Sequence, residues 1–68
     1  MACPGKDAWP ELVGENGQTA KETIERENPL VTANVALVGS PGTTDFRCDR
    51  VRVFVDRDNS VVQVPVIG

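Results

Sequence analysis

Apolar and polar residues alternate most regularly in RVRVFVD, residues 50 to 56. Successive side chains of a strand point to opposite faces, so Val51, Val53 and Val55 share one side. The other side carries Phe54 and charged residues. The pattern therefore predicts a strand whose valines lie in the core and whose arginines lie on the opposite face.

Two more segments, residues 30 to 38 (LVTANVALV) and 61 to 67 (VVQVPVI), also indicate strands. In the first, one side would be formed by Val31, Ala33, Val35 and Leu37. Pro65 places the last strand at a sheet edge or past the ladder, because proline has no N–H to donate. The short turn at 57 to 60 favours an antiparallel hairpin between the second and third strands, and the direction of the first strand stays open.

Residues 16 to 28 predict one helix. One helix face, with the spacing i, i+3, i+4, i+7, is formed by Ala20, Thr23, Ile24 and Glu27. The candidate N-caps are Asn16, Gly17 and Thr19, the last followed by Glu22 as in a capping box. Pro29 disfavours helical backbone at Asn28 and ends the helix. The 68 residues are thus expected to form a single domain, 1 to 68, of the α+β class: one helix packed on a small mixed sheet.

Residues 1 to 15 carry turn signals and read as an N-terminal arm. Trp9, Leu12 and Val13 give this arm its apolar weight, so Trp9 is expected to pack in the core, and a platform that stacks against a ligand is the alternative. The first residues lack the apolar stretch of a signal peptide, and no segment is apolar enough to span a membrane.

The charge pattern argues against nucleic-acid binding. The net charge is −3, and residues 45 to 58 hold four arginines and four aspartates, so their local sum is zero. A phosphate-binding patch would have a clear positive excess. No histidine, nucleophile motif or metal cluster supports catalysis, and we expect no cofactor and no metal.

The only cysteines are Cys3 and Cys48, and they form no CxxC pair. A single disulfide between them is the natural interpretation, and two buried free thiols are the alternative. Closing a loop of this length would stabilise the domain by about 4 kcal/mol. A disulfide favours a secreted or vacuolar location.

The longest segment without a regular pattern is residues 39 to 49, between the first two strands. Arg50 and Arg52 project from one strand face at its base. Their guanidinium groups are suited to bond loop carbonyl oxygens and the Asp45 carboxylate from below. A loop held extended in this way would lose little entropy on binding, which is what an inhibitor that binds a protease as a substrate does would need.

Several motifs agree in order with one family. They are CPGK at 3 to 6, WPELVG at 9 to 14, IERENP at 24 to 29, GSP at 39 to 41, TxDFRCDRVRV at 43 to 53 and VxxVPxIG at 61 to 68. On these motifs the chain resembles the potato inhibitor I family of serine protease inhibitors, in its single-disulfide plant members. The resemblance runs nearly end to end and implies a non-enzymatic, monomeric protein whose partner is a serine protease.

The resemblance also implies roles for individual residues. The reactive bond maps onto Thr44–Asp45, with Thr44 as the primary specificity residue. Other loop contacts map onto Pro41, Gly42, Thr43, Phe46 and Arg47. Loop support maps onto Arg50 and Arg52, and the disulfide onto Cys3–Cys48.

Two positions depart from the family's usual pattern. Members often have Lys, Arg, Leu or Met where Thr44 stands, and a bulky residue where Gly42 stands. Thr44 is too short to reach the acidic base of a trypsin pocket, so elastase-type or subtilisin-type enzymes are the expected targets, with chymotrypsin-type enzymes less suited. Gly42 adds backbone freedom, which leaves open a non-inhibitory interaction or storage protein on the same scaffold.

Overall fold

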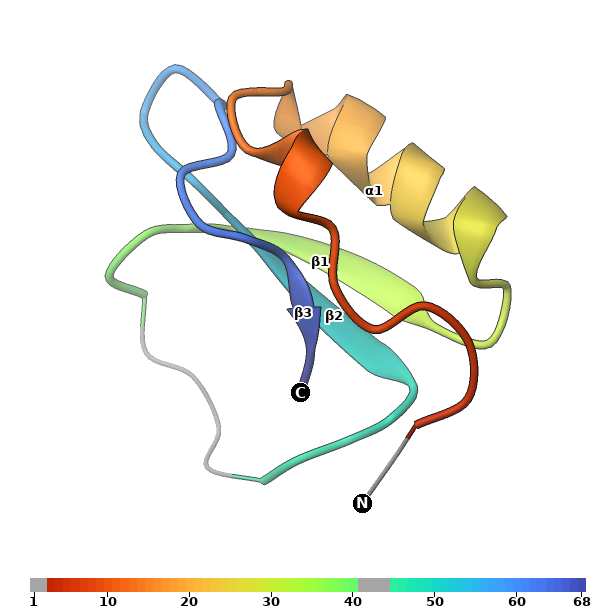
Figure 1. The fold of residues 1–68 in the computed structure, drawn as a ribbon. Helices are drawn as coiled ribbons and strands as arrows, with labels where there is room; N and C mark the ends of the chain where they lie inside the picture. The colour runs from red at the N-terminus through yellow and green to blue at the C-terminus, as the bar shows by residue number, and fades with distance from the viewer. Residues whose placement is uncertain (1–2, 41–44) are drawn as a thin grey trace.

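The computed structural model describes residues 3–40 and 45–68. Its elements in chain order are the short 3-10 helix η1 (Pro10–Leu12), helix α1 (Gly17–Glu27), and strands β1 (Thr32–Leu37), β2 (Arg50–Val55) and β3 (Val66–Ile67). Figure 1 shows α1 lying over one face of the sheet, while residues 45 to 49, which lead into β2, lie away from the helix. The predicted α+β architecture is confirmed.

The sheet has the order β1-β2-β3 and is mixed. β1 pairs parallel to β2, with Thr32 opposite Arg50, and β2 pairs antiparallel to β3, with Val51 opposite Ile67. β1 therefore runs parallel to β2, which answers the question that the sequence left open. A parallel pair needs a long crossover rather than a tight turn, and residues 38 to 49 supply it.

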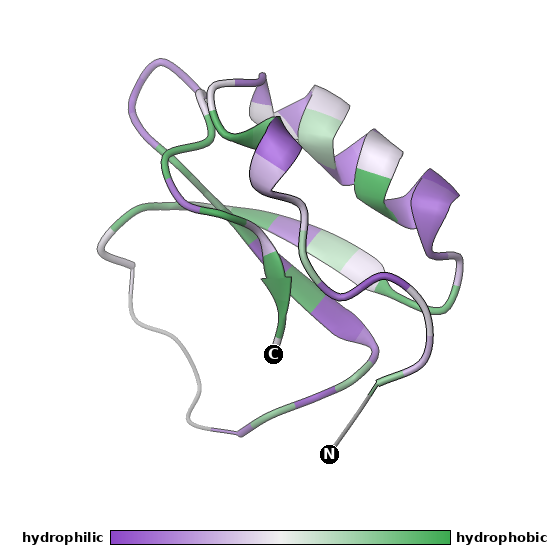
Figure 2. Ribbon diagram, viewed as in Figure 1, coloured by the Kyte–Doolittle hydropathy of each residue, from purple (hydrophilic) through white to green (hydrophobic). Residues whose placement is uncertain are grey.

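The core lies between α1 and the sheet. Val51, Val53 and Val55 are all buried, as the alternation in β2 predicts, and Figure 2 shows this alternation along the strand. Trp9 is completely buried, which confirms it as a core residue. Ile24 of α1 is also completely buried, so one helix face and one sheet face share a single apolar layer.

Helix α1 begins after Asn16, whose side chain accepts hydrogen bonds from the N–H groups of Gln18 at 2.9 Å and Thr19 at 3.3 Å. Asn16 is the N-cap, because its side-chain oxygen satisfies donors that the first turn leaves free. Thr19 therefore lies inside the first turn and is not the cap. At the other end the Asn28 N–H donates to the Ile24 carbonyl, and Pro29 follows.

The burial of β1 differs from the expected pattern. Val31 and Ala33 are buried, but Val35 is 37% exposed and Leu37 is 53% exposed. A Cβ added at Gly17 would lie 3.1 Å from Cγ1 of Val35, so Val35 meets the first residue of the helix. Leu37 lies two residues farther along β1, at its last position.

Strand β3 is shorter than the predicted 61 to 67. Val61 forms an isolated bridge with Val55, and regular pairing with β2 resumes only at Val66. Pro65 lacks an N–H, and its carbonyl accepts a hydrogen bond from the N–H of Trp9 at 2.9 Å. The N-terminal arm thus lies along the outer edge of β3, where local sequence patterns do not place it.

Candidate functional site

The predicted reactive bond joins a residue that the structure does not describe to one that it does. Of the loop positions named above, those that lie outside the described residues are Pro41, Gly42, Thr43 and Thr44. Asp45 is the first described residue after them, and its side chain is 56% exposed. The described part of the site therefore consists of the segment from Asp45 onward and the residues that contact it.

Arg50 connects this segment to the sheet. Its Nη2 donates a hydrogen bond to the carbonyl oxygen of Asp45 at 2.9 Å and lies 3.5 Å from the Asp45 carboxylate. Its Nε donates to the carbonyl oxygen of Gly68 at 2.7 Å. The Arg50 side chain is only 18% exposed. One planar guanidinium thus ties β2, the loop and the last residue together.

Gly68 is a partner that the sequence patterns did not indicate. Its N–H donates to the carbonyl oxygen of Arg50 at 2.9 Å, so these two residues are bonded in both directions. Only the antiparallel register of β2 and β3 brings residue 68 beside residue 50. A glycine at the end of a chain carries no local signal of this role.

Arg52 lies two residues along β2, on the same face as Arg50, and is partly buried. It lines a hollow of about 140 Å³ together with Phe54, Gln63, Val64, Val66 and Gly68. This places Arg52 on the face of the sheet opposite α1, as its position in the alternation predicts. Its bonding to the loop remains a prediction.

Arg47 is paired within its own segment. Its Nε and Nη2 each donate to one carboxylate oxygen of Asp49 at 2.9 Å. These bonds lower the pKa of Asp49 below its usual value, with Arg47 as the main cause, and raise the pKa of Arg47. Both side chains are 57% exposed, so solvent screens the pair. The pair joins two residues of the short segment that leads into β2.

Phe46 is 59% exposed, although it is a large apolar residue. A Cβ added at Gly68 would lie 4.0 Å from Cδ2 of its ring, so one edge of the ring borders the C-terminus. The remaining surface faces solvent. Phe46 therefore combines a contact with the base of the loop and a surface that a partner can cover.

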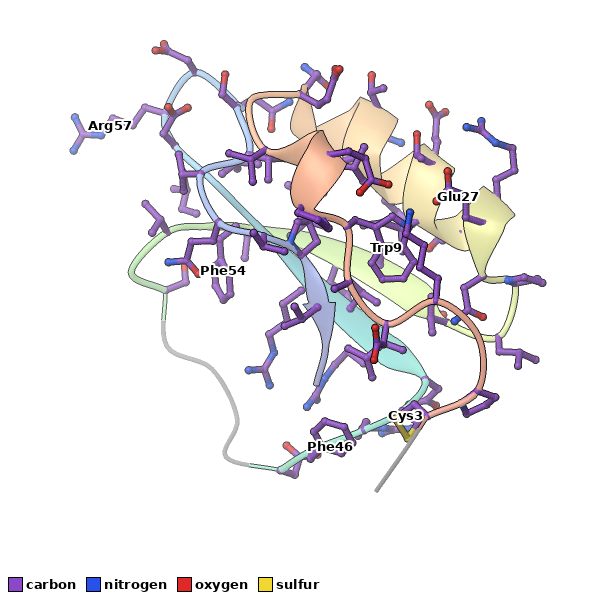
Figure 3. The ribbon with its side chains drawn as sticks, viewed as in Figure 1. Cys3, Trp9, Glu27, Phe46, Phe54 and Arg57 are labelled. Atoms are coloured by element: carbon purple, nitrogen blue, oxygen red, sulfur yellow. A yellow bond between two sulfur atoms is a disulfide. The ribbon has the colours of Figure 1, made fainter. Side chains whose placement is uncertain are left out.

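The disulfide is present between Cys3 and Cys48, with a Cα–Cα distance of 5.3 Å. Neither thiol is free, which excludes the alternative of two buried thiols. Figure 3 shows Cys3 close to the segment that carries Phe46. The bond connects the N-terminal arm to the loop three residues after Asp45.

A second hollow, of about 230 Å³, is lined in part by Arg50. Its lining residues are Thr32, Asn34, Arg47, Asp49 and Arg50. Within residues 3–40 and 45–68, no cluster of His, Cys, Asp or Glu could hold a metal ion. The same ranges contain no helix that is long and apolar enough to cross a membrane.

Comparison with known proteins identifies the scaffold. The model of the potato inhibitor I family matches residues 2–68. The chain belongs to this family. The Glu S.griseus protease inhibitor of Momordica charantia is 58% identical over 66 residues, which cover 97% of each chain. The trypsin/subtilisin inhibitor of Amaranthus caudatus is 57% identical over 63 residues, covering 93% of this chain and 91% of that protein.

Solved structures agree with the fold. The crystal structure of bitter gourd trypsin inhibitor superposes with a TM-score of 0.96 at 54% identity and covers 100% of both chains. The family and these relatives are protease inhibitors, not enzymes. The predicted family and non-enzymatic class are therefore confirmed.

Proposed function

We propose that this member of the potato inhibitor I family inhibits a serine protease in a substrate-like manner, with Thr44–Asp45 as the reactive bond. The observation that carries the proposal is the contact between Arg50 and the carbonyl oxygen of Asp45 at 2.9 Å. It holds the residue that would follow the cleaved bond. If the bond is cleaved, a segment held in place keeps the new amine of Asp45 near the acyl-enzyme. This favours re-formation of the peptide bond over release of the cleaved segment.

Three further restraints support this assignment on the same side of the bond. The disulfide holds Cys48, the Arg47–Asp49 pair joins two residues of the segment, and the Phe46 ring borders Gly68. Each lowers the entropy that the loop would lose on binding, which is how a preformed loop gains affinity. In this proposal Arg52 supports the loop as Arg50 does, from two residues farther along β2.

The proposed target is a protease with a small primary pocket, of the elastase or subtilisin type. Thr44 would enter that pocket, and its short side chain carries no cation for the acidic base of a trypsin pocket. The Amaranthus caudatus relative is named for both trypsin and subtilisin, so a subtilisin-type target is compatible with the scaffold. Relatives named for trypsin show that the scaffold is compatible with that enzyme too, so the specificity has to come from the loop.

The test is an inhibition panel of elastase, subtilisin, chymotrypsin and trypsin, with mass spectrometry of the complexes to locate the cleaved bond. We expect inhibition of elastase or subtilisin at least ~10-fold stronger than that of trypsin, equivalent to about 1.4 kcal/mol. Cleavage at another bond would refute the assignment of Thr44. Absence of inhibition by all four at micromolar protein would favour the alternative, a non-inhibitory interaction or storage protein.

A further inference from the structure

The N-terminal arm is fastened to the end of α1 by the side-chain amide of Asn28. Its Nδ2 donates hydrogen bonds to the carbonyl oxygens of Pro4 at 3.2 Å and Lys6 at 3.0 Å. Its Oδ1 accepts a hydrogen bond from the N–H of Leu30 at 3.1 Å. Asn28 is only 2% exposed, so water competes little for these bonds. The residue that ends the helix therefore also binds the arm.

Gly5 fits closely against this amide. Its φ is +80°, and a Cβ added there would lie 2.8 Å from Nδ2 of Asn28. Such a distance is shorter than side chains tolerate, and the backbone conformation is one that glycine adopts without strain. The arm approaches Asn28 this closely only because residue 5 has no side chain.

The same arm carries one half of the disulfide. Cys3 lies directly before Pro4 and is bonded to Cys48, at the base of the loop. Asn28 follows α1, whose Ile24 is completely buried in the core. A continuous path thus runs from the core to the end of the helix, through the amide to the arm, and through the disulfide to the loop.

We propose that Asn28 is a positioning residue for the reactive loop, because it holds the arm that presents Cys3 to Cys48. A disulfide restrains the loop only as firmly as its other end is fixed. The proposal rests on the proposed function, since the restraint acts on the segment that follows Thr44–Asp45. The ion pair between Lys6 and Glu27 also binds the arm, but it is solvent-exposed and screened.

Coupling of this kind is reciprocal. In the reduced protein, an arm held by the Asn28 amide keeps the Cys3 thiol near the Cys48 thiol. The amide thereby raises the effective concentration of one thiol at the other and favours the disulfide. Equilibrium with glutathione measures this directly. In that exchange two glutathione thiols reduce Cys3–Cys48 to two cysteine thiols and form one molecule of oxidised glutathione.

The first readout is this exchange equilibrium in Asn28→Ala. We expect it to shift toward the dithiol by about tenfold, within the usual range of coupling between two sites. The matched control is Asn16→Ala, which weakens the opposite end of the same helix without touching the arm. An equilibrium unchanged in Asn28→Ala, or shifted equally in the control, would overturn the proposal.

The second readout is the rate of cleavage at Thr44–Asp45 by a protease, followed by mass spectrometry. Asn28→Ala should accelerate cleavage about tenfold in the disulfide-bonded protein. In a protein in which Cys3 and Cys48 are both replaced by serine, Asn28→Ala should leave the cleavage rate unchanged, because Asn28 acts on the loop through the disulfide. Equal acceleration in both backgrounds would show a general loss of stability and would overturn the proposal.

Gly5→Ala provides an independent variant if Asn28→Ala does not fold, because it disturbs the same contact from the side of the arm. It should shift both readouts in the same direction. If the parent protein inhibits no protease, the proposed function fails, and the glutathione equilibrium still decides whether Asn28 and the disulfide are coupled.

Discussion

Arg50 and Gly68 are bonded in both directions: the Nε of Arg50 donates to the Gly68 carbonyl at 2.7 Å, and the Gly68 N–H donates to the Arg50 carbonyl at 2.9 Å. The backbone bond holds Gly68 beside Arg50, and the side-chain bond holds the Nε edge of the guanidinium against Gly68. Its Nη2 is thereby directed at the carbonyl oxygen of Asp45. The C-terminal residue thus helps to orient the side chain that holds the loop.

Replacing Arg50 by alanine should increase the rate of cleavage at Thr44–Asp45 by roughly 10- to 100-fold. The basis is the loss of charge-assisted hydrogen bonds worth about 1.5–3 kcal/mol each. Arg52→Ala should act in the same direction. The rate is measured by mass spectrometry with a limiting amount of protease, and the free energy of unfolding by urea titration. Arg57→Ala, in the exposed turn after β2, is the control. Rates equal to that of the parent would argue against loop support.

Thr44→Lys should improve inhibition of trypsin at least ~100-fold, or about 2.7 kcal/mol, because a long cation can reach the acidic base of the pocket. The inhibition constant is measured with a chromogenic substrate. Thr43→Lys is the matched control, since it adds the same charge one residue earlier. If both variants gain equally, or if the control gains more, the reactive bond has been assigned to the wrong residue.

Reduction of Cys3–Cys48 should lower the thermal midpoint by more than ~10 °C. The bond closes a long loop of the unfolded chain and is worth about 4 kcal/mol. Each kcal/mol corresponds to about 4–8 °C in a domain of this size. The measurement is thermal unfolding with and without reductant, and the doubly substituted Cys3→Ser, Cys48→Ser protein serves as the control for effects of the reductant itself. A midpoint that is the same in all three samples would contradict this expectation.

We expect Glu27 to make the stability of the fold depend on pH. Its Oε1 accepts hydrogen bonds from the Nζ of Lys6 and the Nε1 of Trp9, both at 2.9 Å. The bond from Lys6 is the main reason that the pKa of Glu27 is lowered from 4.5. Because the folded pKa is depressed, this stabilisation is complete above about pH 4.5 and is lost as the pH falls through the folded pKa.

The corresponding experiment compares urea midpoints at pH 6 and pH 3, followed by Trp9 fluorescence. Glu27→Gln removes the charge but keeps an oxygen for the indole, so it should lose less stability on acidification than the parent does. Glu22→Gln is the control, since Glu22 is exposed on the same helix. An identical pH dependence in the parent and Glu27→Gln would show that the pair with Lys6 contributes nothing.

Local pattern determined a large part of the fold. Alternation along β2 predicted which of its side chains enter the core, and the Asn28-Pro29 pair predicted the end of the helix. These features depend on the direction of neighbouring side chains and on the missing N–H of proline, so a few adjacent residues are enough to specify them. Two cysteines without other ligands likewise indicated one disulfide, which the structure contains.

Tertiary structure alone decided the remaining relationships, because they join residues far apart in the chain. The parallel direction of β1, the shortening of β3 at Pro65 and the position of the N-terminal arm all follow from long-range pairing. The same is true at the candidate site, where Arg50 meets Gly68 and Asn28 meets the arm. Each of these contacts depends on the register of the sheet or the packing of the helix. The sequence therefore determined which residue types could support a loop, and the packed structure decided which atoms they bind.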